Sequence, residues 1–122
     1  MIEDKDYTNG HLRAYSTALS GSKRVSTFED ILVGVSLELY LKHPKDFAQK
    51  VLGWEGRKRK YFSRDPKYLD QPKDIADSGI FVETKLSAND TVRRCRDLLE
   101  RFDYSRDSLS IELVDSSEFK EA

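Results

Sequence analysis

A run of four consecutive cations is the feature of this sequence with the clearest chemical meaning. The run lies between a glycine and two aromatic residues in Gly56-Arg57-Lys58-Arg59-Lys60-Tyr61-Phe62, which we call the basic segment. From Gly56 to Lys73 the chain has seven Lys and Arg residues against two Asp, a local charge of +5 in a protein whose formal charge is -1. Concentrated positive charge can attract nucleic acid, a phospholipid surface or an acidic protein, and the alternative is an ordinary solvated surface run.

Length and composition predict one globular domain over residues 1–122, with frayed ends at 1–8 and 115–122. A chain of 122 residues with 38% apolar and 35% charged content can bury a core without disulfides. The single cysteine and two separate histidines match no zinc spacing, so we expect no cofactor and no metal. No apolar run is long enough for a membrane span, and the acidic start is unlike a signal peptide, which predicts a cytoplasmic protein.

Hydrophobic periodicity predicts helices along most of the chain. The first has Asn9 as its N-cap, then Leu12, Tyr15, Leu19 and a terminal Gly21. The second, central helix begins with the capping-box pair Ser26 and Glu29 and ends near His43-Pro44, and a short third helix contains Phe47, Ala48 and Val51 and ends at Gly53. A clear amphipathic helix follows over residues 90–102, with Cys95 on its apolar face and Arg93, Arg96 and Glu100 turned elsewhere. Residues 105–113 fit either a helix capped by Ser105 or an alternating strand.

Two short strands are predicted at residues 59–62 and 80–84, and their backbone groups need a partner. Antiparallel pairing would bring residues 56–59 next to residues 84–89, at the start of the last long helix, where free N-H groups can bind phosphate. The predicted fold is therefore α+β and mostly helical, with a two-stranded antiparallel ribbon. The predicted binding surface comprises Arg57, Lys58, Arg59, Lys60, Lys85, Ser87 and Asn89.

These residue types suit contact with double-stranded DNA. Arginine can pair with guanine through two hydrogen bonds in the major groove, as Arg57 and Arg59 could. Lys, Ser and Asn can bind phosphates or base edges, and for Lys58 and Lys60 phosphate contact or simple solvation is the expected role. Tyr61 and Phe62 are expected in the core.

The sequence resembles the C-terminal DNA-binding domain of the SeqA family, the bacterial negative modulators of replication initiation. The resemblance covers about residues 36–113 and includes the basic segment, where only Lys58 departs from the family pattern Gly-Arg-Thr-Arg followed by Tyr-Phe. Other shared landmarks, in the same order, are Leu39-Tyr40, Phe47-Ala48, Asp65, Leu69, Pro72-Lys73, Val82, Thr84 and Cys95 through Tyr104.

The resemblance implies a mostly helical domain that binds hemimethylated GATC sites through loops at one end of a two-stranded ribbon. Arg57 and Arg59 match the two DNA-contacting arginines of the family. The second loop of the family reads Asn-Thr-Asn-Thr, whereas this chain has Lys85-Leu86-Ser87-Ala88, so the target sequence and base modification stay open. The family also has an N-terminal oligomerisation domain, whereas the residues before 36 are predicted to be helix here, so a homodimer would form in another way.

We therefore expect a non-enzymatic, nucleoid-associated DNA-binding protein that reads a sequence or a modification in replication control. Two alternatives stay open: a protein-interaction module whose basic segment binds an acidic partner, and a non-specific DNA binder. A nuclease is not expected, because the sequence has no acidic pair at metal spacing, no Ser/His/Asp order and no phosphate-binding glycine motif.

Overall fold

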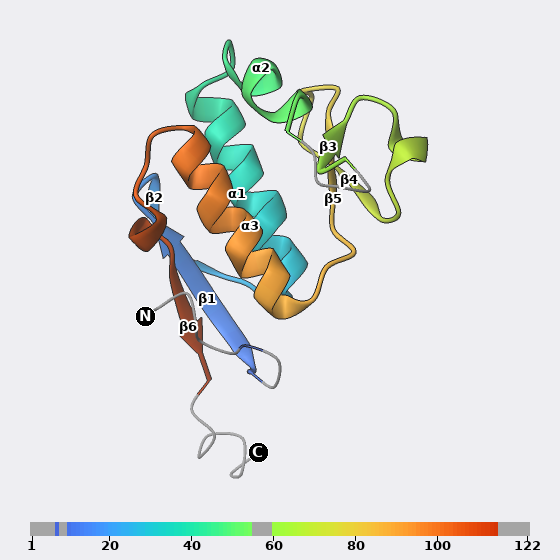
Figure 1. Cartoon of the computed structure of the whole chain (residues 1–122). Helices are drawn as coiled ribbons and strands as arrows, with labels where there is room; N and C mark the ends of the chain where they lie inside the picture. Colours follow the sequence, from blue (N-terminus) through green and yellow to red (C-terminus); the bar gives the residue numbers. More distant parts are fainter. Residues whose placement is uncertain (1–6, 8–9, 55–59, 115–122) are drawn as a thin grey trace.

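The computed structural model describes residues 7, 10–54 and 60–114, which form three α-helices and six short strands. The strands make two three-stranded antiparallel sheets, and one sheet lies to each side of a central helix pair (Figure 1). The fold is therefore mixed α+β, and the prediction of a mostly helical domain with a single two-stranded ribbon is wrong. Within the described ranges, no helix has the length and apolar character needed to cross a membrane.

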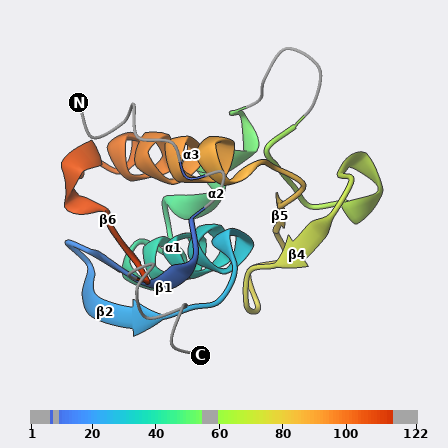
Figure 2. The same cartoon turned by 90° about the horizontal axis from the view of Figure 1, so that it is seen from below.

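The central pair consists of α1 (Phe28–Lys42) and α3 (Ala88–Arg101), which lie side by side in both views (Figures 1 and 2). Thr27 caps α1, because its side chain accepts the Asp30 N-H at 3.3 Å, so the helix begins close to the predicted capping box. The predicted end near His43 is confirmed. The short helix α2 (Phe47–Leu52), which ends at Gly53, is confirmed as well.

The first sheet has the order β2-β1-β6 and includes the segment that was predicted to be the first helix. Strands β1 (Leu12–Thr17) and β2 (Ser20–Arg24) form a hairpin, and β6 (Ser110–Leu113) pairs with the other edge of β1. The spacing of Leu12, Tyr15 and Leu19 fits a helix, but the intervening Ser, Thr and Gly residues are weak helix formers. Because β6 forms at residues 110–113, the strand interpretation of residues 109–113 is the correct one. Ser105 caps only a short 3-10 helix, η3 (Arg106–Ser108).

Tyr15 connects β1 to α1 because its side chain packs directly against the helix backbone at Gly34. Its hydroxyl donates to the Glu38 carboxylate at 3.0 Å, and Thr17 donates to the other carboxylate oxygen at 3.2 Å. The ring lies against Gly34, where an added Cβ would be 2.1 Å from the Tyr15 hydroxyl oxygen. A residue without a side chain is therefore needed at position 34 for this packing.

The second sheet has the order β3-β5-β4. The predicted antiparallel pairing is confirmed, because β3 (Phe62–Ser63) pairs with β5 (Phe81–Glu83), with Phe62 opposite Val82. A third strand, β4 (Pro72–Asp74), which was not among the predicted strands, occupies the other side of β5. Proline is tolerated there because β4 is an edge strand and one side of its backbone needs no partner.

The core is continuous from the helix pair to the second sheet. The Phe47 ring of α2 contacts Phe62 of β3 at 6.2 Å and Phe102 at 5.9 Å between ring centroids. Phe62 and Cys95 are fully buried, as predicted, and burial raises the pKa of the Cys95 thiol well above its ordinary value. Tyr7 is also buried, although it lies in the terminus predicted to fray; the rest of residues 1–8 and all of 115–122 lie outside the described residues.

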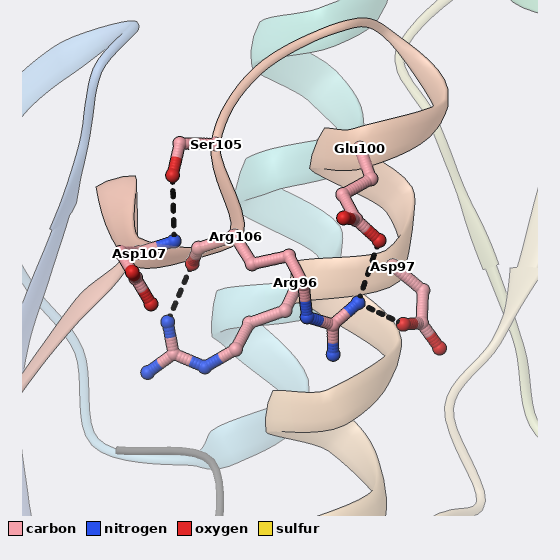
Figure 3. Close-up of polar contacts among 6 residues, drawn as sticks. All are labelled: Arg96, Asp97, Glu100, Ser105, Arg106 and Asp107. Atoms are coloured by element: carbon pink, nitrogen blue, oxygen red, sulfur yellow. Dashed lines mark hydrogen bonds and ion pairs between the residues drawn. The ribbon is translucent and has the colours of Figure 1, made fainter. Parts of the chain in front are cut away.

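Arg96 is buried, contrary to the prediction that it would turn away from the core (Figure 3). Its Nη1 donates to the carbonyl oxygens of Arg106 at 2.6 Å and Leu109 at 3.0 Å. Arg106 in turn forms ion pairs with Asp97 and Glu100 on the outer side of α3. These contacts hold the turn between α3 and β6, so Arg96 has a structural role.

Candidate functional site

Three chain segments meet at the end of the second sheet where β5 finishes. The Glu83 N-H donates to the Tyr61 carbonyl at 2.9 Å, and the Thr84 N-H donates to the Gln71 carbonyl at 3.0 Å. The Thr84 hydroxyl donates to the same carbonyl at 2.7 Å. Lys60, which precedes β3, and Lys85, which follows β5, therefore lie at the same end of the sheet.

A buried carboxylate fixes the loops at this end. Glu83 is 1% exposed, and its side chain accepts the backbone N-H groups of Asp70 at 2.6 Å, Gln71 at 3.0 Å and Lys85 at 2.9 Å. Charge-assisted hydrogen bonds to backbone donors are strong, so one side chain holds the segment before β4 and the segment after β5 in register. Sequence reasoning missed this role, because Glu83 was read only as part of a strand.

Ser87 and Asn89, two residues of the predicted binding surface, lie at the start of α3, and their side chains make internal hydrogen bonds. The Ser87 hydroxyl accepts the Asp90 N-H at 3.1 Å and caps α3, which begins two residues earlier than predicted. The Asn89 side-chain oxygen accepts the Tyr7 N-H at 2.6 Å. The Asp90 N-H in the first turn of α3 is therefore already bound by Ser87, and the Asp90 carboxylate adds negative charge there. Both features weaken the predicted phosphate pocket.

Arg57, Lys58 and Arg59 lie outside the described residues, but Trp54 and Tyr61, on either side of them in the sequence, form an aromatic pair. Trp54 precedes the segment and Tyr61 belongs to it, and their rings pack edge to face with centroids 4.9 Å apart. The Trp54 ring also stacks on Phe62 at 6.1 Å. The base of the segment is therefore anchored on the core, and Trp54 and Tyr61 are both half-buried.

Two arginines of α3 stack on this aromatic pair. The guanidinium carbon of Arg94 lies 3.3 Å from the Tyr61 ring centroid, and that of Arg101 lies 4.8 Å from the Trp54 centroid. Arg101 Nε also donates to the Lys50 carbonyl at 2.9 Å, and the Lys50 ammonium lies 5.6 Å from the centroid of the Phe102 ring. We call Lys50, Trp54, Tyr61, Arg94 and Arg101 the cation-aromatic cluster.

The sequence analysis did not identify this cluster. Arg94 and Arg101 are seven residues apart, which is two helical turns, so their spacing could have indicated a shared face of α3. Nothing in the sequence indicated that α3 would pack against the base of the basic segment, because that contact is set by tertiary structure.

The three cations of the cluster have few close acidic partners among the described residues, although Asp90 and Asp97 are close enough to act on Arg94. No carboxylate within the described ranges forms an ion pair with Lys50, Arg94 or Arg101, whereas Arg93 pairs with Asp90 at 2.8 Å. Burial lowers the pKa of Arg94, but a guanidinium remains charged at neutral pH. The cluster therefore adds positive potential next to the basic segment.

The described part of the chain has no group of three His, Cys, Asp or Glu side chains that could bind a metal ion. No protein-family model matches the sequence, and no curated protein matches it significantly.

Proposed function

We propose that this protein binds double-stranded DNA through the basic segment, in the manner of the SeqA C-terminal domain that its sequence resembles. The observation that carries the proposal is the meeting of Lys60, Lys85 and the base of the basic segment at one end of the second sheet. Lys60 and Lys85, which are distant in sequence, contribute positive charge at one end of the sheet, and this supports the arrangement that the resemblance implies.

In this proposal the arginines and lysines have different roles. Arg57 and Arg59 enter the major groove, where a guanidinium can bind guanine O6 and N7 together. Lys58, Lys60 and Lys85 contact phosphates and set the position of the protein on the duplex. The rigid base made by Trp54 and Tyr61 limits the conformational entropy lost when the segment binds.

The finer proposal is that this protein is nucleoid-associated and reads hemimethylated GATC sites in replication control. Lys85-Leu86-Ser87-Ala88 replaces the asparagine run of the family, and the Ser87 and Asn89 side chains make internal hydrogen bonds. Base discrimination therefore rests mainly on Arg57 and Arg59. A second copy of the chain is a further proposed partner, because two basic segments would bind paired sites with higher avidity.

Fluorescence anisotropy with four duplexes tests the proposal: unmethylated, hemimethylated and fully methylated GATC, and one duplex without GATC. Each is titrated across a salt series from about 50 to about 200 mM. A preference of about tenfold or more for the hemimethylated duplex, equal to about 1.4 kcal/mol, supports the finer proposal. Equal binding to all four with a steep salt dependence supports the non-specific DNA binder. No salt-dependent binding to any duplex rejects DNA as the partner.

An acidic protein is the second candidate partner. It is favoured by the internal hydrogen bonds of Ser87 and Asn89, which leave fewer groups to read base edges. This alternative predicts no duplex binding, together with capture of an acidic protein that is lost when Arg57 and Arg59 are replaced by Ala.

A further inference from the structure

We infer that Lys50 and Arg101 form a second phosphate-binding surface, beside the basic segment, that contacts the DNA backbone flanking the bases read by Arg57 and Arg59. This inference rests on the proposed function and extends it to α2 and α3. It adds residues that neither the basic segment nor the loop after β5 contains.

The first step of the argument is position. Trp54 and Tyr61 lie at either end of the undescribed stretch 55–59, and the Arg101 guanidinium lies over the Trp54 ring. A duplex bound by the basic segment must pass close to the base of that segment. The surface next to the base is then adjacent to the flanking phosphates.

The second step is charge. Asp97 and Glu100 are the two carboxylates in the C-terminal half of α3, and Arg106 binds both (Figure 3). Arg101 and Lys50 have no ion pair among the described residues, so they remain available to an external anion.

The third step is geometry. The Arg101 guanidinium is held by the Trp54 ring and by the bond from Nε to the Lys50 carbonyl at 2.9 Å. Its terminal nitrogens are then the groups that can donate to phosphate, and the side chain is preorganised for that contact. Lys50 supplies a second cation through its ammonium group.

Arg94 has a different role in the cluster. Its Nη1 is buried and has no hydrogen-bond partner among the described residues, and its guanidinium lies flat enough against Tyr61 to approach the ring at 3.3 Å. An arginine held in this way contributes potential and fixes Tyr61, but it does not reach a phosphate. Arg94 is therefore a positioning residue.

The test is the binding of one GATC duplex and one scrambled duplex by wild type, Lys50→Ala, Arg101→Ala and the double variant, across the salt series. Each lost phosphate contact is expected to lower the salt slope by about 0.9, so wild type and variant converge by about 3.5-fold between about 50 and about 200 mM salt. The ratio of affinities for the two duplexes should not change, because phosphates carry no sequence information.

Arg93→Ala is the matched control, because Arg93 is exposed on the same helix but pairs with Asp90. Its affinity should stay within about twofold of wild type, a change of about 0.4 kcal/mol. Arg101→Lys keeps the charge and should retain the salt slope, whereas a purely structural role of the Nε bond predicts loss in both Arg101 variants.

Wild-type affinity and slope in the folded Arg101→Ala and Lys50→Ala proteins would overturn the inference, and so would a changed ratio between the two duplexes. If Arg57→Ala weakens binding while the Lys50 and Arg101 variants do not, only the second surface fails. If wild type binds neither duplex, the proposed function is rejected, and the inference, which depends on it, is rejected as well.

Discussion

The guanidinium carbon of Arg94 lies 3.3 Å from the centroid of the Tyr61 ring, so α3 contacts the end of the basic segment through a cation on an aromatic face. Tyr61 also packs edge to face on Trp54, and Trp54 carries Arg101. A cation on an aromatic face contributes about 0.5 to 1 kcal/mol when exposed and about 2 kcal/mol or more when desolvated, and here both groups are half-buried. The contact between Arg94 and Tyr61 therefore couples the stability of α3 to the packing of Tyr61 at the base of the basic segment.

Replacing Tyr61 tests this coupling. Tyr61→Leu should lower the free energy of unfolding by about 1 to 2 kcal/mol, because it removes the aromatic face from Arg94 and Trp54. Tyr61→Phe should cost less than about 0.5 kcal/mol, because the ring is kept. Urea denaturation of both variants measures the difference, and equal losses would assign the effect to the hydroxyl rather than to the ring.

Replacing Glu83 tests whether one carboxylate holds the loops around Lys85. Glu83→Ala leaves three backbone donors without their acceptor and should cost on the order of 3 kcal/mol. The amide protons of Asp70, Gln71 and Lys85 should exchange faster with solvent. Glu112→Ala is the control, because its pair with Arg13 is on the surface and should contribute less than about 1 kcal/mol. Unchanged exchange at the three amides would refute the clamp.

Gly34→Ala tests the close approach of β1 to α1. The new methyl group would lie 2.1 Å from the Tyr15 hydroxyl oxygen, so the variant should lose about 1 to 3 kcal/mol of stability. The same change in a Tyr15→Phe background should cost less, because the nearest atom is then absent. A loss of the same size in both backgrounds, measured by urea denaturation, would show that Tyr15 is not the obstacle.

Tyr15 also predicts a pH dependence. Burial, reinforced by the Glu38 carboxylate, raises the pKa of the Tyr15 hydroxyl far above its ordinary value of 10.0. In the unfolded chain the hydroxyl loses its proton near pH 10 while the folded state keeps it, so the stabilisation is complete below that pH and declines above it. Between about pH 10 and about pH 11, wild type should lose up to about 1.4 kcal/mol relative to Tyr15→Phe. Parallel stability curves for the two proteins would contradict this.

The strongest periodic patterns predicted the parts of the fold that depend on local sequence. Residues 90–102 have a continuous apolar face, and α3 forms there; the predicted strand at 80–84 corresponds to β5. The first predicted helix failed because helical spacing of three apolar residues is a weak signal. The hydrogen bonds of Tyr15 and Thr17 to Glu38 on α1 stabilise a strand at this segment instead. Strand β4 was not predicted because proline is unfavourable inside a sheet. Pro72 is tolerated because β4 lies at an edge.

The candidate site, like the fold, was only partly predictable from the sequence. The basic segment was recognisable from its run of cations, and the placement of Lys60 and Lys85 at one end of the sheet follows from the pairing of two recognisable strands. The roles of Ser87, Asn89 and Arg96 depend on partners from distant parts of the chain or on the cap of α3, so spacing alone did not indicate them. The stacking of Arg94 and Arg101 on Trp54 and Tyr61 likewise depends on how α3 packs.

The central claim is that the basic segment binds DNA, and the most direct measurement is the salt dependence of duplex binding by an Arg57→Ala, Arg59→Ala double variant. Arg24→Ala is the control, because Arg24 is an exposed arginine of β2 on the first sheet. The double variant should lose about 2 to 6 kcal/mol of binding free energy and its preference among duplexes, while the control keeps both. Equal binding by wild type, control and double variant would contradict the account.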